Sequence, residues 1–148
     1  MGSVTLKDVN ITSLGKISTE GGDVFHAMKN TDAGFAGYGE AYFSWINYGA
    51  VKAWKRHLTM TMNLIVPLGN VRFVFYADNN DESDHYRVIE IGMDNYSRIT
   101  VPQGIWFGFQ GLAAPKSLIL NISNISHESD EVERRALDRI PYIWEAPY

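Results

Sequence analysis

The sequence predicts an all-β domain, either a sandwich or a barrel. Short segments rich in Val, Ile, Phe and Tyr recur along most of the chain. Turn-forming residues cluster between them, as in "PLGN" at 67–70 and "ADNNDESD" at 77–84. A chain of 148 residues with 45% hydrophobic residues is long enough to bury a core in one domain.

The predicted strands follow one another closely. They lie at 40–46, 58–67, 71–77, 86–93, 97–102, 105–112 and 117–126. One helix is predicted in "SDEVERRALDRI" over 129–140, because Ser129 or Asp130 can cap its N-terminus. Acidic residues precede arginines in this segment, which is the order that a helix dipole favours.

Two glycine-centred turns make the fold prediction more specific. The stretches "VPLGNV" (66–71) and "TVPQGIWFGF" (100–109) both have the form strand, Pro-x-Gly turn, strand. This layout is typical of a cupin, which is a double-stranded β-helix or jelly roll. No repeat or linker interrupts it, so we expect a single cupin domain. Its parts are an N-terminal arm with loops (1–39), the barrel (40–126), and a C-terminal helix and tail (127–148).

Charge and composition exclude several classes of protein. The formal net charge is −4, whereas general binders of nucleic acid or of membrane surfaces need an excess of Lys and Arg. The chain has no cysteine, which excludes disulfides, zinc–thiolate sites and thiol nucleophiles. The first residues, "MGSVTLKDVN", contain no apolar run typical of a signal peptide, so a cytoplasmic location is expected.

Three motifs resemble those of the dTDP-4-dehydrorhamnose 3,5-epimerase family. The stretch "VPQGIWFGFQGL" is similar to that family's "PxGxxHGF" turn, "GAVKAWKRH" resembles its "GVLRGLHYQ" strand, and "ALDRIPYIW" resembles its C-terminal "DDPxxxIxWP" segment. The resemblance extends over residues 40–144. It implies a cupin barrel that acts on a nucleotide-linked 4-keto sugar, and a two-fold dimer with exchange of the N-terminal arm.

The two cupin motifs lack the ligands of a metal-binding cupin. Cupins of that kind use two His and a Glu on the first motif and one His on the second. This chain offers His57 alone on the first motif, Thr59 in place of a second ligand, and Phe107 at the expected His of the second motif. One imidazole cannot hold a metal ion that needs at least three converging ligands. We therefore expect no metal and no other cofactor.

The resemblance also assigns candidate site residues. An alignment without gaps places Lys52 at the family's phosphate-binding Arg and Lys55 at its catalytic His, whereas a shift of two residues places His57 at the catalytic position. Asp138 matches the Asp that orients this His. Other residues occupy the positions of the family's site Lys and acid Tyr: Met62, and Ile119 or Leu120.

Strand alternation predicts a common face for several polar residues. Side chains two positions apart point the same way, so one face is expected to carry Lys55, His57, Thr59, Thr61 and Asn63. Removing a proton beside a carbonyl needs a base and a group that stabilises the enolate, roles suited to His57 and Lys55. The simpler alternative is that this polar face is a solvated strand end.

The site hypothesis has catalytic and substrate-binding members. The catalytic candidates are His57 as the base, Lys55 as the cation for the oxyanion, and Asp138 as the residue that fixes the imidazole tautomer. Lys52 at the barrel mouth is expected to meet the diphosphate. The remaining substrate-binding candidates are Thr59, Asn63 and Phe107.

The sequence is compatible with two functions. The first is a metal-independent epimerase or isomerase of a nucleotide-linked 4-keto-deoxysugar in surface polysaccharide biosynthesis, which the retention of Asp138 with Lys55 and His57 favours. The second is a non-catalytic sugar-nucleotide or carbohydrate-binding cupin that has lost the epimerase acid–base residues, which Met62 and Phe107 favour. In either case we expect a nucleotide-sugar ligand and a homodimer, with no nucleic acid or membrane partner. The N-terminal arm is expected to cover an open sheet edge, in its own subunit or in a partner.

Overall fold

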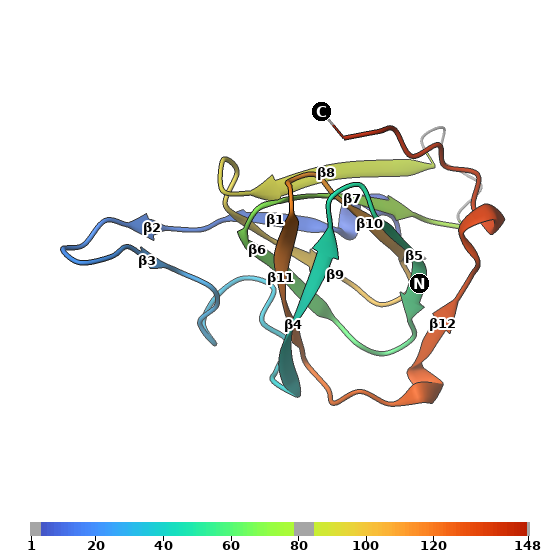
Figure 1. Ribbon diagram of the computed structural model, residues 1–148. Coiled ribbons are helices and arrows are strands. Elements are labelled where there is room, and N and C mark those ends of the chain that lie inside the picture. Colours follow the sequence, from blue (N-terminus) through green and yellow to red (C-terminus); the bar gives the residue numbers. More distant parts are fainter. Residues whose placement is uncertain (1–3, 79–84, 148) are drawn as a thin grey trace.

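Two antiparallel sheets pack face to face in the computed structural model, which describes residues 4–78 and 85–147 (Figure 1). The first sheet contains, in spatial order, β1 (Asn10–Ser13), β9 (Ser97–Val101), β6 (Met62–Leu68), β11 (Lys116–Ser123) and β4 (Glu40–Asn47). The second contains β12 (Val132–Arg134), β5 (Val51–His57), β10 (Trp106–Gly111), β7 (Asn70–Tyr76) and β8 (Tyr86–Gly92). Neighbouring strands run antiparallel within each sheet, and the fold is the predicted cupin-type jelly roll.

The main core lies between the two sheets, because their inward side chains are apolar. Leu64 and Val66 of the first sheet are fully buried against Phe73 and Phe75 of the second. Burial of each such side chain contributes about 1.5–3 kcal/mol. A second apolar cluster covers the outer face of the second sheet and is packed under the C-terminal tail. Its buried members are Trp54, Val74, Trp106 and Ile140.

The predicted strands are all present, but the strand predicted at 58–67 begins later than expected, and this alters which residues can belong to the site. The strand predicted at 58–67 begins at Met62, because the chain crosses from the second sheet to the first after His57. The residues before this crossing form β5, which sequence reasoning had not separated from the following strand. The predicted polar face is therefore wrong, since it is divided between two sheets.

The C-terminal helix predicted over 129–140 is wrong. The segment forms a 3-10 turn η2 (Ser129–Glu131), the strand β12 and a second 3-10 turn η3 (Leu137–Arg139). Helix propensity is a weak preference, and here tertiary pairing overrides it because β12 hydrogen-bonds along the edge of β5.

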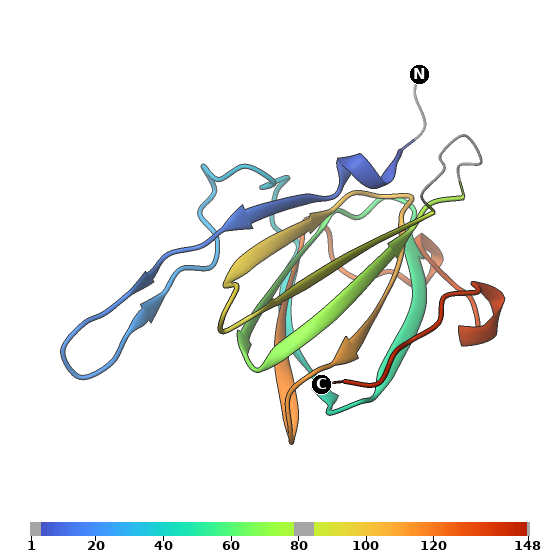
Figure 2. The same cartoon turned by 90° about the horizontal axis from the view of Figure 1, so that it is seen from above.

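The N-terminal arm contributes to the sheet before it leaves the barrel. After η1 (Leu6–Asp8), β1 pairs with β9, which confirms that the arm covers a sheet edge of its own subunit. The strands β2 (Lys16–Ile17) and β3 (Val24–Phe25) then form a hairpin that projects from the barrel (Figure 2). Across residues 4–78 and 85–147, no helix has the length and apolar character needed to cross a membrane.

Candidate active site

A bulge in β5 brings two lysines to the same face of the second sheet. Phe107 of β10 lies opposite Lys55, whereas Phe109 lies opposite Lys52, so β5 carries one more residue than β10 over this stretch. Lys52 and Lys55 therefore lie on the same face of the sheet, whereas in a regular strand residues three positions apart point to opposite faces. Gly108 permits the close approach of the two strands, because a Cβ at this position would lie 2.5 Å from a β5 side chain.

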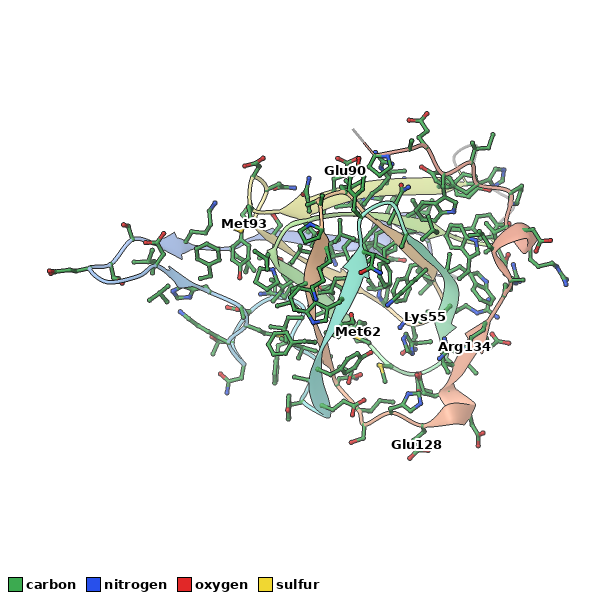
Figure 3. All side chains as sticks on the ribbon, viewed as in Figure 1. Lys55, Met62, Glu90, Met93, Glu128 and Arg134 are labelled. Atoms are coloured by element: carbon green, nitrogen blue, oxygen red, sulfur yellow. The ribbon has the colours of Figure 1, made fainter. Side chains whose placement is uncertain are left out.

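This face borders a pocket with a volume of about 540 Å³. Its lining includes the cations Lys52, Lys55, Arg134 and Arg135. The aromatic rings of Phe107 and Phe109 also line it, and no carboxylate does so among the described residues. Figure 3 shows Lys55 on β5 and Arg134 on the neighbouring β12 at the same end of the second sheet. A cationic pocket of this size suits an anionic small molecule.

Lys55 is the most confined cation of the pocket. Its Nζ lies 5.4 Å from the centre of the Phe107 ring, and Arg134 is directly opposite on β12. Burial lowers the pKa of Lys55, and the nearby charge of Arg134 lowers it further against the opposing effect of Glu131. Like charges opposite each other on neighbouring strands destabilise a sheet, and an anion bound between them would relieve this repulsion.

The remaining cations of the pocket differ in their partners. Arg135 donates hydrogen bonds to Asp78 from Nη1 and Nη2 at 3.3 and 3.1 Å. Lys52 donates from Nζ to the backbone oxygen of Trp45 at 2.9 Å and so links β5 to β4 of the other sheet. Arg134 pairs with no carboxylate within the described part of the chain, which leaves its guanidinium available to a ligand.

His57, the last residue of β5, is only 5% exposed and is hydrogen-bonded through Nδ1 to one carboxylate oxygen of Glu131. The other carboxylate oxygen accepts hydrogen bonds from the backbone N–H groups of Met60 at 3.1 Å and Thr59 at 3.3 Å. The Nε2 atom of His57 is buried and has no hydrogen-bond partner among the described residues. Its ring centre lies 6.1 Å from that of Phe107, which joins His57 to the wall of the pocket.

Electrostatics determine the protonation states of His57 and Glu131. Burial alone would raise the pKa of Glu131, but the hydrogen bonds from His57 and the backbone lower it below its ordinary value, so Glu131 is ionised. A carboxylate can only accept, so Nδ1 of His57 carries the proton and Nε2 keeps a free lone pair. Burial lowers the pKa of His57 despite the opposing effect of Glu131, so the imidazole is neutral at neutral pH. A neutral imidazole with an unpaired nitrogen can act as a general base.

The inner face of β4 carries a tyrosine, Tyr42, in the first sheet. Tyr42 lies on the same inward face as Ile46, which is buried in the core. The side chain of Tyr42 itself is 39% exposed. Burial and the nearby charge of Glu40 raise the pKa of Tyr42, and the charge of Arg134 opposes this rise. The same face is polar beyond Tyr42, since Asn121 of β11 donates to Oγ of Ser44 at 3.0 Å.

The structure brings together four of the residues predicted for the site. Lys52, Lys55 and Phe107 line one pocket, and His57 lies against the Phe107 ring. The cations of "KAWKRH" are therefore more than a solvated strand end, because Lys52 and Lys55 line a pocket and His57 is buried beside it.

Three other predicted residues lie elsewhere. Thr59 is in the turn after β5, where its backbone N–H binds Glu131. Asn63 is buried in β6 and donates to the backbone oxygen of Gly34 at 3.0 Å, away from the pocket lining. Asp138 is exposed in η3, so the carboxylate that contacts His57 is Glu131 and not Asp138.

Sequence reasoning missed Glu131, Arg134 and Tyr42. The first two lie in the segment predicted as a helix, and the strand there is only three residues long, too short for a clear alternating pattern. The inward direction of Tyr42 follows from alternation in "EAYFSWI", but no local signal places this strand across the pocket from β5.

The fold and the site together define a class of protein. Beside a cationic pocket, the jelly roll carries a neutral imidazole at His57 and a desolvated lysine at Lys55, an arrangement suited to proton transfer on an anionic small molecule. Within residues 4–78 and 85–147, no group of three or more His, Asp or Glu side chains could hold a metal ion.

Comparison with known proteins identifies the family. The chain is 32% identical to a dTDP sugar isomerase from Desulfovibrio desulfuricans, and the two structures align with a TM-score of 0.87 over 93% of this chain and 91% of that one. The protein therefore belongs to the cupin-fold family of sugar-nucleotide isomerases and epimerases.

Two further proteins resemble the chain, one over a smaller part of its length and one at lower sequence identity. The "Probable low-salt glycan biosynthesis epimerase" of Haloferax volcanii is 32% identical over 105 residues, which are 69% of this chain and 65% of that protein. A sugar 3,4-ketoisomerase from Thermoanaerobacterium thermosaccharolyticum, determined with TDP, shares the fold with a TM-score of 0.74 at 14% identity, over 88% of this chain and 90% of that one. No sequence-family model matches the chain.

Proposed function

We propose that the protein is a metal-independent isomerase or epimerase of a nucleotide-linked 4-keto-deoxysugar, acting in surface polysaccharide biosynthesis. The observation that carries this proposal is the buried His57, held at Nδ1 by Glu131 with Nε2 unpaired and Lys55 nearby. The names of the relatives support it, since one is a dTDP sugar isomerase and another a glycan biosynthesis epimerase. The TDP bound in the ketoisomerase structure supports a thymidine nucleotide as the carrier.

The reaction begins with loss of a proton from the carbon next to the C4 carbonyl. Nε2 of His57 accepts this proton, and the electron pair of the broken C–H bond moves into an enolate. The Lys55 ammonium stabilises the oxyanion, and Glu131 keeps the second proton on Nδ1 and stabilises the imidazolium. A positioned general base typically contributes about 10²–10⁴-fold to the rate.

Tyr42 is the proposed acid, because it lies on the inward face of β4, in the sheet opposite His57, and the charge of Arg134 acts on it. Its raised pKa keeps the phenol protonated at neutral pH, so it can donate a proton to the enolate. Protonation of the same carbon from the opposite face gives an epimer. Ketoisomerisation results instead when the former carbonyl carbon is protonated and the proton of the neighbouring hydroxyl passes to the former carbonyl oxygen, which leaves the carbonyl at the neighbouring position.

The cations at the pocket mouth are the proposed diphosphate site. The guanidinium of Arg134 offers a planar pair of donors that suits phosphate oxygens, and Lys52 adds a second positive charge. The rings of Phe107 and Phe109 then form an apolar floor for the sugar.

The proposal includes a cytoplasmic homodimer. On the outer face of β4, Phe43 is 63% exposed and Trp45 is 42% exposed, opposite Leu120 and Leu118 of β11. A continuous apolar surface beside an open sheet edge is typical of an interface. Sedimentation at micromolar concentration is expected to give a dimer. Removal of residues 1–22 is expected to weaken it, because the family resemblance implies that this arm also contacts the partner subunit. A monomer under these conditions would contradict this part of the proposal.

The deciding experiment is a solvent-exchange assay. The protein is incubated in D₂O with a panel of nucleotide-linked 4-keto-deoxysugars, and NMR follows deuterium entry next to the carbonyl and the identity of the product. We expect exchange at one carbon with at least one thymidine-linked sugar, unaffected by a chelator. Tight binding without exchange by any sugar would favour the non-catalytic cupin, and dependence on a divalent metal would remove the metal-independent mechanism.

A further inference from the structure

A cluster of four residues, one of which, Arg135, also lines the pocket, ties three parts of the second sheet together. Its centre is Asp78, which follows β7 and accepts hydrogen bonds from Nε1 of Trp106 at 3.1 Å, from Arg135 at 3.1 and 3.3 Å, and from Arg56 at 3.4 Å. Both guanidinium groups also lie over the Trp106 ring, 4.2 Å away for Arg135 and 4.7 Å for Arg56. We call these four residues the Asp78 clamp.

The strand β12 is held to β5 by a short backbone ladder and by this clamp. The ladder is extended by the mutual backbone hydrogen bonds of Arg135 and Trp54, both 3.1 Å long. The strand has three residues and hydrogen-bonds only to β5, as the last strand of the sheet. Its inward side chain Arg134 lies opposite Lys55, and repulsion between these cations pushes β12 away from β5. On the outside, Glu133 accepts a hydrogen bond from Nε of Arg56 at 2.9 Å, and Arg135 binds Asp78.

We infer that Asp78 is a positioning residue of the active site, although it does not line the pocket. The inference rests on the proposed function, in which Arg134 binds the diphosphate. The clamp anchors Arg135, the next residue along the chain, and thereby holds Arg134 against its repulsion from Lys55. It also fixes the segment that begins with Glu131, the partner of the catalytic histidine.

The charge of Asp78 makes the clamp strong. Burial alone would raise its pKa, but the hydrogen bonds from Arg135 and Trp106 and the nearby arginine charges lower it below its ordinary value. Asp78 is therefore ionised at neutral pH, and hydrogen bonds to an ionised acceptor are stronger than neutral ones. Replacement of the carboxylate should free β12 to move away from β5, with loss of Arg134 from the pocket.

The test compares Asp78→Ala with Glu90→Ala. Glu90 pairs with Arg72 at 2.9 Å on the same sheet, but it lies on β8, the strand farthest from β12. Figure 3 shows Glu90 well separated from Arg134. Both changes remove a carboxylate that binds an arginine, so Glu90→Ala controls for a general loss of stability. Asp78→Asn is the milder companion variant, which keeps the shape of the side chain and removes its charge.

Binding of dTDP to each purified protein is measured by calorimetry, which requires no turnover. We expect Asp78→Ala to bind dTDP about tenfold more weakly than wild type, the scale of one lost charged hydrogen bond, and Asp78→Asn to show a smaller loss. Glu90→Ala should bind as wild type does. Equal affinity in wild type and both Asp78 variants, or an equal loss in Glu90→Ala, would overturn the positioning role.

A second measurement separates this inference from the proposed function. NMR titration of the lysine Cε groups, with Lys55 assigned from the spectrum of Lys55→Met, should show the pKa of Lys55 rising in Asp78→Ala, because Arg134 moves away and burial decreases. Absence of dTDP binding by the wild type would defeat the proposed nucleotide site alone. The Lys55 titration would then still decide the role of Asp78, since an unchanged pKa would overturn it.

Discussion

Glu131 accepts a hydrogen bond from Nδ1 of His57 although 74 positions separate the two residues in the sequence. Glu131 is itself only 7% exposed, and the backbone N–H groups of the turn after β5 hold its second oxygen. This geometry fixes the imidazole tautomer and leaves Nε2 free.

His57→Asn should abolish exchange of the substrate proton with solvent while the protein stays folded. Asn retains hydrogen-bonding capacity but cannot take up a proton near neutral pH. We expect the rate of deuterium incorporation, measured by NMR in D₂O, to fall by about 10²–10⁴-fold. Nucleotide affinity should change little, because His57 does not bind the diphosphate in the proposed site. Wild-type exchange in this variant would exclude His57 as the base.

Glu131→Gln should lower kcat strongly, whereas Asp138→Asn should leave it unchanged. Gln cannot hold the protonated Nδ1 as a carboxylate does, and loss of such a tautomer-fixing carboxylate costs up to about 10⁴-fold. Asp138 is exposed in η3 and serves as the matched control. Steady-state kinetics of both variants provide the measurement. A larger loss in Asp138→Asn than in Glu131→Gln would restore Asp138 as the orienting residue.

Lys55→Met should reduce turnover and change the alkaline limb of the pH–rate profile. In the wild type, burial and Arg134 lower the pKa of Lys55 from 10.5, so the enolate loses its cation as pH rises toward that value. The variant lacks this titration, and the remaining limb should move to the higher pKa of Tyr42. Profiles of kcat recorded from neutral to alkaline pH test this. An unchanged limb in Lys55→Met would show that another group limits the rate.

Tyr42→Phe should allow proton removal but block product formation. The variant keeps the ring and loses only the hydroxyl that is proposed to protonate the enolate. Deuterium should therefore still enter the recovered substrate in D₂O, while product formation falls by about 10²–10⁴-fold. Tyr38→Phe is the control, because Tyr38 is 67% exposed and lies outside the proposed site. Equal losses of exchange and product in Tyr42→Phe would assign Tyr42 a different role.

Folding stability should fall as the pH drops below the ordinary His value of 6.5. The folded-state pKa of His57 is below 6.5 because of burial, so the unfolded chain binds more protons in this range and acid favours unfolding. The pKa of Glu131 is also lowered, which adds the same effect at more acidic pH. Melting temperatures of wild type and His57→Asn between about pH 7 and about pH 5 should show a shallower decline in the variant. Parallel declines would contradict the lowered pKa of His57.

Much of the fold could be predicted because strands and turns carry local signals. The segment "VRFVFYA" contains β-branched and aromatic residues and follows a Gly-Asn turn, and it forms β7 between Asn70 and Tyr76. The alternation in "EAYFSWI" likewise predicted β4. The helix prediction failed because a run of acidic residues followed by arginines is compatible with a helix and with an edge strand. The local pattern cannot distinguish these two environments.

The site could be predicted only in part for a related reason. The cations of "KAWKRH" and the ring of Phe107 were identified from composition and motif, and these residues meet because β5 and β10 are neighbours. Thr59 and Asn63 were misplaced because strict alternation was extended past His57, where the chain leaves the sheet.

The sequence by itself determined the class of fold, seven of the barrel strands and the cationic character of the segment that forms β5. Tertiary structure alone decided that Glu131 is the partner of His57 and that Arg134 lies opposite Lys55. Strand formation depends on residues close together in the chain, so periodicity reveals it. A site assembled from β4, β5 and β12 depends on which sheet edges pair across long separations, and that choice is made by the hydrogen bonds and packing of the whole fold.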